Sequence, residues 1–168
     1  GNIMVHKTKS GELQIGLIDL ARCSALGSVH SHKVQGAVSR NPPEVLLLPV
    51  AQIHMESADI YALGCCLYTF FFQRQYPGSR LYDIRDLSRL SQNEKTALYE
   101  KVEREYRLQC KTVEEYLKKR KKAHTKNKDK QEIKMERFQK NILKMLHPDP
   151  KKRILLSKVL EALDSALE

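Results

Sequence analysis

Two short apolar runs near the N-terminus have the composition of β-strands. They cover residues 2–6 (NIMVH) and residues 13–18 (LQIGLI), and both are rich in branched apolar side chains. The polar segment between them, KTKSGE, contains a glycine, which is typical of a turn between two antiparallel strands. We therefore expect a β-hairpin at the start of the chain.

The hydrophobic pattern is lost after the second run and returns as helices. Residues 22–41 contain Ser, Gly and His with little periodicity, and we expect a long loop there. Residues 42–44 (PPE) then open a short helix or turn, because proline suits a first helical position. The rest of the chain shows helical patterns only.

A long apolar helix is expected over residues 57–74. Ser57 can cap its N-terminus, and Asp59 favours its positive end. The apolar residues leave almost no polar face: Ile60, Leu63, Cys66, Leu67, Phe70 and Phe71. A helix that is apolar nearly all round belongs at the centre of a domain and needs neighbours on several sides.

Two capping-box patterns predict two amphipathic helices in the second half of the chain. The first is Ser91 followed by Glu94, and the second is Thr112 followed by Glu115. Each precedes apolar residues at helical spacing, so we expect one helix to begin at each pattern.

Two further helices are expected near the C-terminus. Phe138, Ile142 and Leu146 repeat at four-residue spacing, and residues 147–150 (HPDP) must end that helix, because residues before proline avoid the α region. A last helix over residues 157–167 has three leucines on one expected apolar face: Leu160, Leu163 and Leu167.

The charge is strongly basic and unevenly distributed. The chain has 30 Lys+Arg and 20 Asp+Glu, a net charge of +10. This favours acidic partners such as nucleic acid, anionic lipid or phosphorylated ligands, or else a solvated basic face. Residues 111–140 hold twelve Lys/Arg against five Asp/Glu, and within them KKRKKAHTKNKDK (118–130) is expected to fray or loop out.

Length and cysteine usage indicate one globular intracellular domain. The 168 residues with an apolar share of 41% allow a real core. None of the four cysteines forms a C-x-x-C pair, which argues against a zinc site or a secreted disulfide framework and suits the cytoplasm. We expect no signal peptide and no membrane span, because the longest mainly apolar stretch, residues 60–72, is shorter than the ~20 residues required.

Five segments, in order, resemble the signature segments of the protein kinases. Residues 1–5 (GNIMV) resemble the end of the catalytic loop, and residues 18–21 (IDLA) the strand leading into D-F-G. Residues 36–47 (GAVSRNPPEVLL) are similar to the segment ending in A-P-E. Residues 57–65 (SADIYALGC) resemble the opening of the central helix, and residues 146–153 (LHPDPKKR) the L-x-x-D-P-x-x-R element.

The resemblance covers nearly the whole chain but only the C-terminal lobe of a Ser/Thr-type kinase. It implies a mainly α fold with a short N-terminal β-hairpin and a long activation-segment loop. Residues 1–168 would be a partial kinase domain, with residues 88–137 as a charged helical insertion. In an intact protein, the implied activity is ATP-dependent phosphoryl transfer to Ser/Thr of a protein substrate.

The resemblance also implies a binding site for Mg²⁺ with ATP. Asp19 would supply a carboxylate and Asn2 an amide oxygen, which suits magnesium because it prefers hard oxygen ligands. The hairpin is expected to bring the two together, since they flank its strands. The alternative for Asp19 is a structural turn residue at a strand end.

Other positions take structural roles by resemblance. Glu44 and Arg153 would form a buried ion pair, the alternative being two surface charges. Asp59 would accept hydrogen bonds from the catalytic-loop backbone; the alternative is simple stabilisation of the helix dipole, and the two roles are compatible. Residues 20–44 would be the activation segment, with four candidate phosphorylation sites: Ser24, Ser28, Ser31 and Ser39.

Several kinase features cannot be placed in this sequence. The Gly-rich loop, the paired Lys and the catalytic Asp are not found, and only Gly1 precedes Asn2. No catalytic residue is therefore assigned, and the expected partner is an N-terminal lobe or an equivalent chain. Leu20 and Ala21 replace the usual Phe and Gly of D-F-G, and alanine restricts the backbone there.

Two alternatives remain open. The chain could be a catalytically inactive kinase-like scaffold whose basic insertion docks an acidic protein. It could instead be a basic helical RNA-binding protein, but it has no Trp and its Phe residues cluster, unlike stacking platforms for single strands. Nucleic acid is therefore the least favoured partner.

Overall fold

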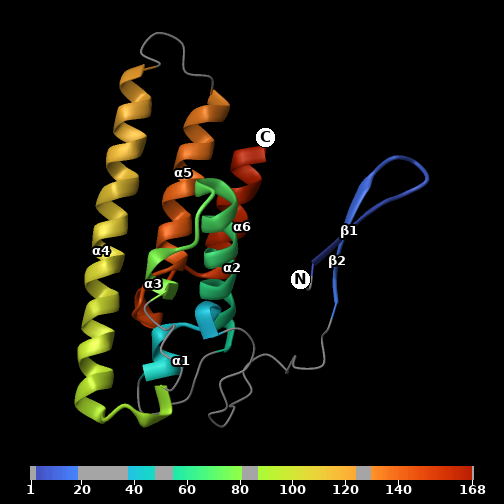
Figure 1. Ribbon diagram of the computed structural model, residues 1–168. Helices are drawn as coiled ribbons and strands as arrows, with labels where there is room; N and C mark the ends of the chain where they lie inside the picture. The colour runs from blue at the N-terminus through green and yellow to red at the C-terminus, as the bar shows by residue number, and fades with distance from the viewer. Residues whose placement is uncertain (1–2, 19–37, 48–54, 81–86, 124–129, 168) are drawn as a thin grey trace.

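The computed structural model describes residues 3–18, 38–47, 55–80, 87–123 and 130–167 (Figure 1). This part of the chain is mainly helical, with a two-stranded antiparallel sheet at its N-terminal end. The expected mainly α class with a short hairpin is confirmed. No helix in these described ranges is long and apolar enough to span a membrane.

The N-terminal hairpin forms where the apolar runs predict it. β1 (Ile3–Lys7) pairs with β2 (Leu13–Leu17), with Ile3 opposite Leu17 at the open end. The turn is closed by the Thr8 N–H, which donates to the Glu12 carbonyl at 2.8 Å. Gly11 has φ +91°, a conformation that glycine adopts without steric cost.

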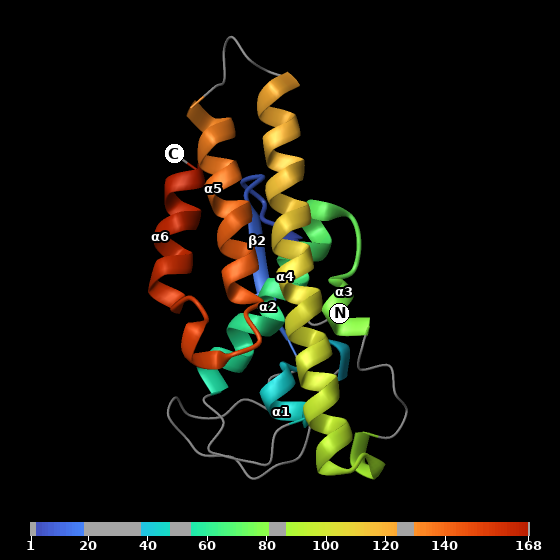
Figure 2. The same cartoon turned by 90° about the vertical axis from the view of Figure 1, so that its left-hand side faces the viewer.

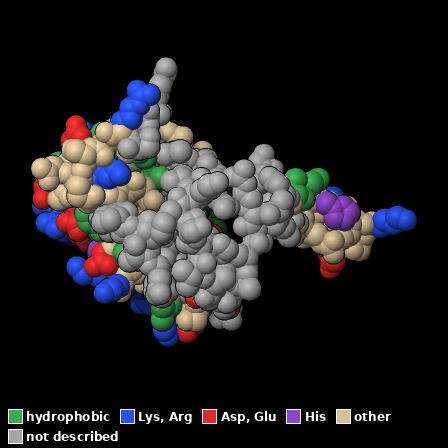
Figure 3. All heavy atoms as spheres, turned by 90° about the horizontal axis from the view of Figure 1, so that it is seen from below, with side chains coloured by type: hydrophobic (Ala, Val, Ile, Leu, Met, Phe, Trp, Pro, Cys, Tyr) green, Lys and Arg blue, Asp and Glu red, His purple; other side chains and the backbone are tan. Residues whose placement is uncertain are grey.

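Apolar side chains on the hairpin are exposed. Figure 3 shows hydrophobic side chains at the surface of the projecting hairpin. Val5 and Ile15 lie opposite each other and are 62% and 74% exposed, and Leu13, two residues from Ile15 and on the same face, is 71% exposed. This face of the sheet has no cover from the described part of the chain.

A short helix follows the predicted proline pair. α1 (Pro43–Leu47) begins at the second proline, and the Val45 N–H donates to the Pro42 carbonyl at 3.0 Å. A 3₁₀ turn, η1 (Val38–Arg40), precedes it. Most of the loop expected over residues 22–41 lies outside the described residues.

The apolar helix α2 (Met55–Phe72) is buried along one side only. Tyr61 and Tyr68 are fully buried, whereas Phe70 is 68% exposed. The helix begins before Ser57, so the prediction that Ser57 is its N-terminal cap is wrong. It ends two residues before the expected Arg74, and the short helix α3 (Pro77–Arg80) follows.

A single long helix replaces the two predicted from the capping boxes. α4 (Gln92–Ala123) follows the 3₁₀ turn η2 (Leu87–Arg89). The first box is confirmed, because the Ser91 N–H donates to Glu94 Oε2 at 2.7 Å. The second is wrong, because Thr112 lies inside α4 and its hydroxyl donates to the Leu108 carbonyl at 3.0 Å.

The physical reason lies in the sequence between the two boxes. No Gly or Pro occurs within α4, so nothing interrupts the helix. Val102, Val113 and Leu117 are all buried, and their spacing places them on one side of a continuous helix. Burial of that stripe outweighs the local preference of Thr112 for a helix start.

The last two helices complete the bundle. α5 (Lys130–Met145) buries Phe138 and Ile142 as predicted and ends before HPDP, which leads into the 3₁₀ turn η3 (Pro150–Lys152). α6 (Leu156–Leu167) follows. Figures 1 and 2 show α4, α5 and α6 alongside one another, with α2 packed against α5.

The apolar face expected for the last helix is confirmed only in part. Leu163 packs against the main core as predicted, but Leu160 is 51% exposed. Val159 is instead 3% exposed and packs with Ile60 and Met145. The helix turns its Val159 side inward because α2 and α5 together form the surface it contacts. The leucine spacing alone could not specify this rotation.

Candidate functional site

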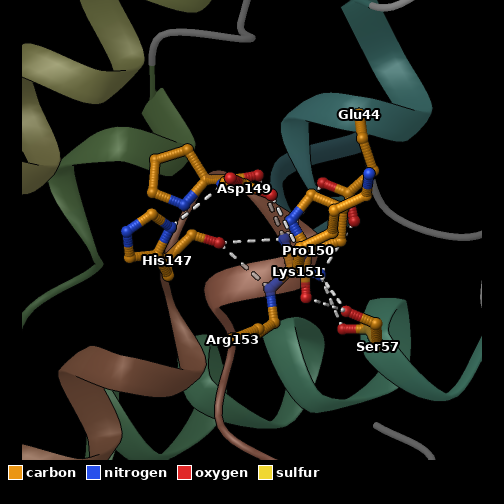
Figure 4. A network of polar contacts seen from close by, with 8 residues as sticks. Glu44, Ser57, His147, Asp149, Pro150, Lys151 and Arg153 are labelled. Carbon is orange, nitrogen blue, oxygen red and sulfur yellow. Dashed lines mark hydrogen bonds and ion pairs between the residues drawn. The ribbon is translucent and has the colours of Figure 1, made fainter.

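A polar cluster joins the start of α1, the start of α2 and the segment between α5 and η3 (Figure 4). Its scaffold is the turn at residues 147–153. Asp149 caps η3, with its Oδ1 accepting from the Lys151 N–H at 2.9 Å. The two prolines of this segment exclude an α-helix there, so the backbone carbonyls of His147 and Pro148 remain available to a side chain.

Arg153 and Glu44 form a bidentate ion pair at the centre of the cluster. Arg153 Nη1 lies 2.8 Å from Glu44 Oε1, and Nη2 lies 3.0 Å from Oε2. The two side chains are 1% and 11% exposed. The predicted buried pair is confirmed, and the alternative of two surface charges is wrong.

The remaining donors of Arg153 are also satisfied. Nη1 donates to the Ser57 carbonyl at 2.7 Å and to its hydroxyl at 2.9 Å. Nε and Nη2 donate to the His147 carbonyl at 3.0 and 2.9 Å. The guanidinium also lies 5.1 Å from the ring centroid of Tyr61. A buried charge is tolerated only with this kind of full compensation.

His147 is held as a neutral hydrogen-bond acceptor. Its Nδ1 accepts from the Asp149 N–H at 3.0 Å, and its ring lies 4.9 Å from that of Tyr106. Partial burial lowers the pKa of the imidazole, against a smaller opposing effect of the Asp149 carboxylate. Protonation would remove the acceptor and add a positive charge near Arg153.

Asp59 lies on the open side of α2. Its side chain is exposed to solvent, but nearby protein atoms remove part of the water around the carboxyl group. This partial desolvation raises the pKa of the Asp59 carboxyl. No hydrogen bond to Asp59 is formed within the described ranges. Its expected role as an acceptor for the catalytic-loop backbone stays a prediction.

The two predicted magnesium ligands, Asn2 and Asp19, lie outside the described residues, as do Leu20 and Ala21. The described part of the hairpin ends at the paired residues Ile3 and Leu17. Among the described residues, no group of three or more His, Cys, Asp or Glu could hold a metal ion. The magnesium site therefore stays a prediction.

Only one of the four expected phosphorylation sites lies among the described residues. Ser39 lies in η1, whereas Ser24, Ser28 and Ser31 lie outside the described residues. Next to Ser39, Arg40 donates from Nη1 to the Cys66 sulfur at 2.6 Å, which ties η1 to α2. No sequence signal indicated this contact.

The cysteines in the described ranges are free thiols, namely Cys65, Cys66 and Cys110. Burial raises the pKa of Cys65 to about 12, so this thiol is not a nucleophile near neutral pH.

The cluster around Arg153 fixes structure, because its hydrogen bonds and its ion pair join α1, α2 and the turn at residues 147–153. It holds the C-terminal end of the predicted activation segment against α2. Sequence reasoning identified Glu44 and Arg153 but not the contacts that Arg153 makes with Ser57 and His147. His147 contributes through a backbone carbonyl, which any residue carries, and Ser57 through its carbonyl and its hydroxyl.

Comparisons with protein-family models, curated proteins and solved structures gave no match. Within the described residues, the Glu44–Arg153 pair is a contact that joins two of the motif segments.

Proposed function

We propose that the chain is the C-terminal lobe of a protein kinase. In the intact protein it would transfer the γ-phosphoryl group of ATP to Ser/Thr of a protein substrate. The observation that carries this proposal is the bidentate Glu44–Arg153 pair, which joins P-P-E to D-P-x-x-R across 109 positions. The kinase resemblance predicted this contact between two segments that no local pattern relates.

The pair would act by positioning the substrate-facing loop. Glu44 lies in the first turn of α1 and is the last residue of the predicted activation segment, residues 20–44. Arg153 fixes that turn to the first turn of α2 through Ser57. One end of the loop is thus held by the helical bundle. Catalysis of phosphoryl transfer depends mostly on the positioning of the reactants, so a fixed substrate-facing loop would favour it.

Asn2 and Asp19 are the proposed magnesium ligands. They lie one and two residues from Ile3 and Leu17, which pair at the open end of the hairpin. An amide and a carboxylate are a suitable donor set for Mg²⁺. Bound Mg²⁺ would neutralise the phosphate oxygens of ATP, while the chain's own residues hold the ion between the two strand ends.

The exposed apolar surface supports a partner lobe. Leu63 and Phe70 are 40% and 68% exposed on α2, and the Val5–Ile15 face of the hairpin is uncovered. Surfaces of this kind are typically covered in a complete domain. We propose that the rest of the kinase domain, or an equivalent chain, packs against them. Its catalytic loop would supply the catalytic Asp, and its N-terminal lobe would supply the ATP-binding Lys.

The proposal is tested by a phosphoryl-transfer assay on the protein encoded by the longest open reading frame that contains this chain. We expect labelled γ-phosphate to pass from ATP-Mg to a general protein substrate. Asp19→Asn should lower the rate at least about a hundredfold, because one metal ligand is lost. Glu12→Gln, in the exposed hairpin turn, is the matched control and should leave the rate unchanged. Equal rates for Asp19→Asn and wild type would refute the magnesium assignment.

The second candidate is an inactive kinase-like scaffold, favoured by the length and charge of α4. This helix has 32 residues, and its C-terminal half exposes Lys111, Lys118 and Lys119. Such a surface could dock an acidic protein. A scaffold would show no phosphoryl transfer, and deletion of residues 118–134 would abolish partner binding; in an active kinase the same deletion should spare catalysis.

A further inference from the structure

An open cavity of about 470 Å³ lies between α5, η3 and α6. Figure 2 shows α5 and α6 side by side, connected at their lower ends by the segment that contains η3. The Ile154 N–H bonds to the Lys144 carbonyl at 3.4 Å, which ties this connection to the end of α5. The cavity is therefore built on three elements that are packed together.

Three lysines from these three elements line the cavity. Lys144 comes from α5, Lys152 from η3 and Lys158 from α6. They face a single lining carboxylate, that of Glu161. Lys144 is exposed, and the side chains of Lys152 and Lys158 are 67% and 61% exposed, so their ammonium groups are solvated. An anion bound among them would relieve the mutual repulsion of these like charges.

The existing ion pairs leave positive charge unbalanced. Lys158 Nζ lies 3.0 and 2.8 Å from the two oxygens of Glu161, so these two charges compensate each other. Lys152 is 3.6 Å from Asp149 Oδ2, a long and exposed contact. Lys144 has no ion-pair partner within the described ranges.

The rest of the lining is suited to the body of an organic ligand. Ile154 and Ala162 form an apolar wall, and Asn141 offers an amide that can donate or accept. The volume exceeds that of a phosphate ion alone. A ligand that combines an anionic group with a carbon-containing part would use all of these features.

We propose that this cavity binds a small organic phosphate. The phosphate would lie among Lys144, Lys152 and Lys158, and the carbon-containing part would lie against Ile154 and Ala162. A phosphorylated lipid headgroup presents the same chemistry, so the experiment separates the two sources. The site contains no residue of the proposed magnesium centre, and its existence does not depend on kinase activity.

Phenyl phosphate and inorganic phosphate are the probes, titrated calorimetrically into the full-length protein at fixed low salt. We expect saturable binding, tighter for phenyl phosphate because the apolar wall contacts its ring. The double variant Lys144→Gln/Lys158→Gln should weaken binding about tenfold through loss of two charge-assisted contacts. Glu161→Gln should tighten binding a few-fold, because it releases Lys158 and removes the only carboxylate lining the site.

The matched control is Lys118→Gln/Lys119→Gln, which removes the same number of charges from exposed positions. These residues lie near the C-terminal end of α4, which is its upper end in Figure 2, whereas η3 lies near the lower end of the bundle. It should change the affinity less than twofold. Equal weakening by both double variants would mean general electrostatic attraction and would overturn the proposal. A gain in affinity for Glu161→Gln supports it, since misfolding cannot produce a gain.

Vesicles of phosphatidylcholine, with and without phosphatidylinositol 4-phosphate, form the second arm. The assignment to a soluble ligand would be overturned by two results together. The protein would co-sediment with vesicles only when the phosphorylated lipid and Lys144 are both present, and it would not bind phenyl phosphate. Absence of saturable binding in both arms would overturn the site itself.

Discussion

Glu44 and Arg153, 109 positions apart, meet through two parallel hydrogen bonds of 2.8 and 3.0 Å in a site almost closed to solvent. Loss of one partner leaves the other charge buried without compensation. That penalty is much larger than the loss of an exposed ion pair, because exposed charges regain hydration.

The first prediction concerns this pair. Glu44→Ala should lower the free energy of unfolding by about 3–5 kcal/mol, measured by denaturant titration of the intact protein. Glu100→Ala is the control, since Glu100 pairs with Arg104 at 3.8 Å on the surface, and it should cost less than about 1 kcal/mol. A double-mutant cycle with Arg153→Ala that shows no coupling would contradict the assigned interaction.

The second prediction is a pH dependence that originates at His147. Burial lowers the pKa of this imidazole in the folded state below its unfolded value of about 6.5. The unfolded state therefore binds more protons at acidic pH, so the contribution to stability is complete above the unfolded pKa and is lost as pH falls through the folded pKa.

His147→Asn gives the comparison, because asparagine stays neutral and its amide oxygen can still accept from the Asp149 N–H. Melting temperatures of wild type and variant should diverge as the pH is lowered from about 7.5 to about 5, the wild type losing more. A constant difference across that range would show that His147 is not the titrating group.

The third prediction compares the two capping-box residues. Ser91→Ala should destabilise the protein by about 1 kcal/mol, because Ser91 caps a real helix end. Thr112→Ala should be neutral or stabilising, because Thr112 lies inside α4, where alanine has the higher helix propensity. Equal destabilisation by both substitutions would indicate two helices in place of one.

The fourth prediction tests the close contact of α2 and α5. A Cβ at Gly64 would lie 2.9 Å from Met145 Cβ and 3.2 Å from Leu146 Cδ2. Gly64→Ala should therefore cost about 1–3 kcal/mol by forcing the helices apart. Gly16→Ala is the control, since nothing lies within 4 Å of the added atom, and its unfolding midpoint should not fall below that of wild type.

The fifth prediction concerns the 168-residue chain studied alone. Its exposed apolar side chains, such as Ile15 at 74% and Phe70 at 68%, should bind a hydrophobic dye and promote aggregation. Leu13→Lys/Ile15→Thr should reduce both signals, while Lys7→Thr should not. Strong near-UV dichroism without dye binding would contradict a loosely packed state.

Local sequence patterns were sufficient to predict those helices and strands whose hydrophobic spacing and turn residues agree with the packing around them. The hairpin follows from alternating branched residues around a glycine turn, and α5 follows from Phe138 and Ile142 followed by a proline pair. At Thr112 and Leu160 the local signals conflicted with the packing. There, burial of neighbouring residues across several helices outweighed a capping preference or a leucine repeat.

The sequence by itself determined the helical class, the hairpin and, through two motifs, the partnership of Glu44 with Arg153. Only the tertiary structure decided that α4 is continuous, that Val159 faces inward, and that three lysines line one cavity. The reason is that periodicity and capping act over a few residues, whereas the rotation of a helix and the meeting of distant charges depend on the surfaces that other elements present.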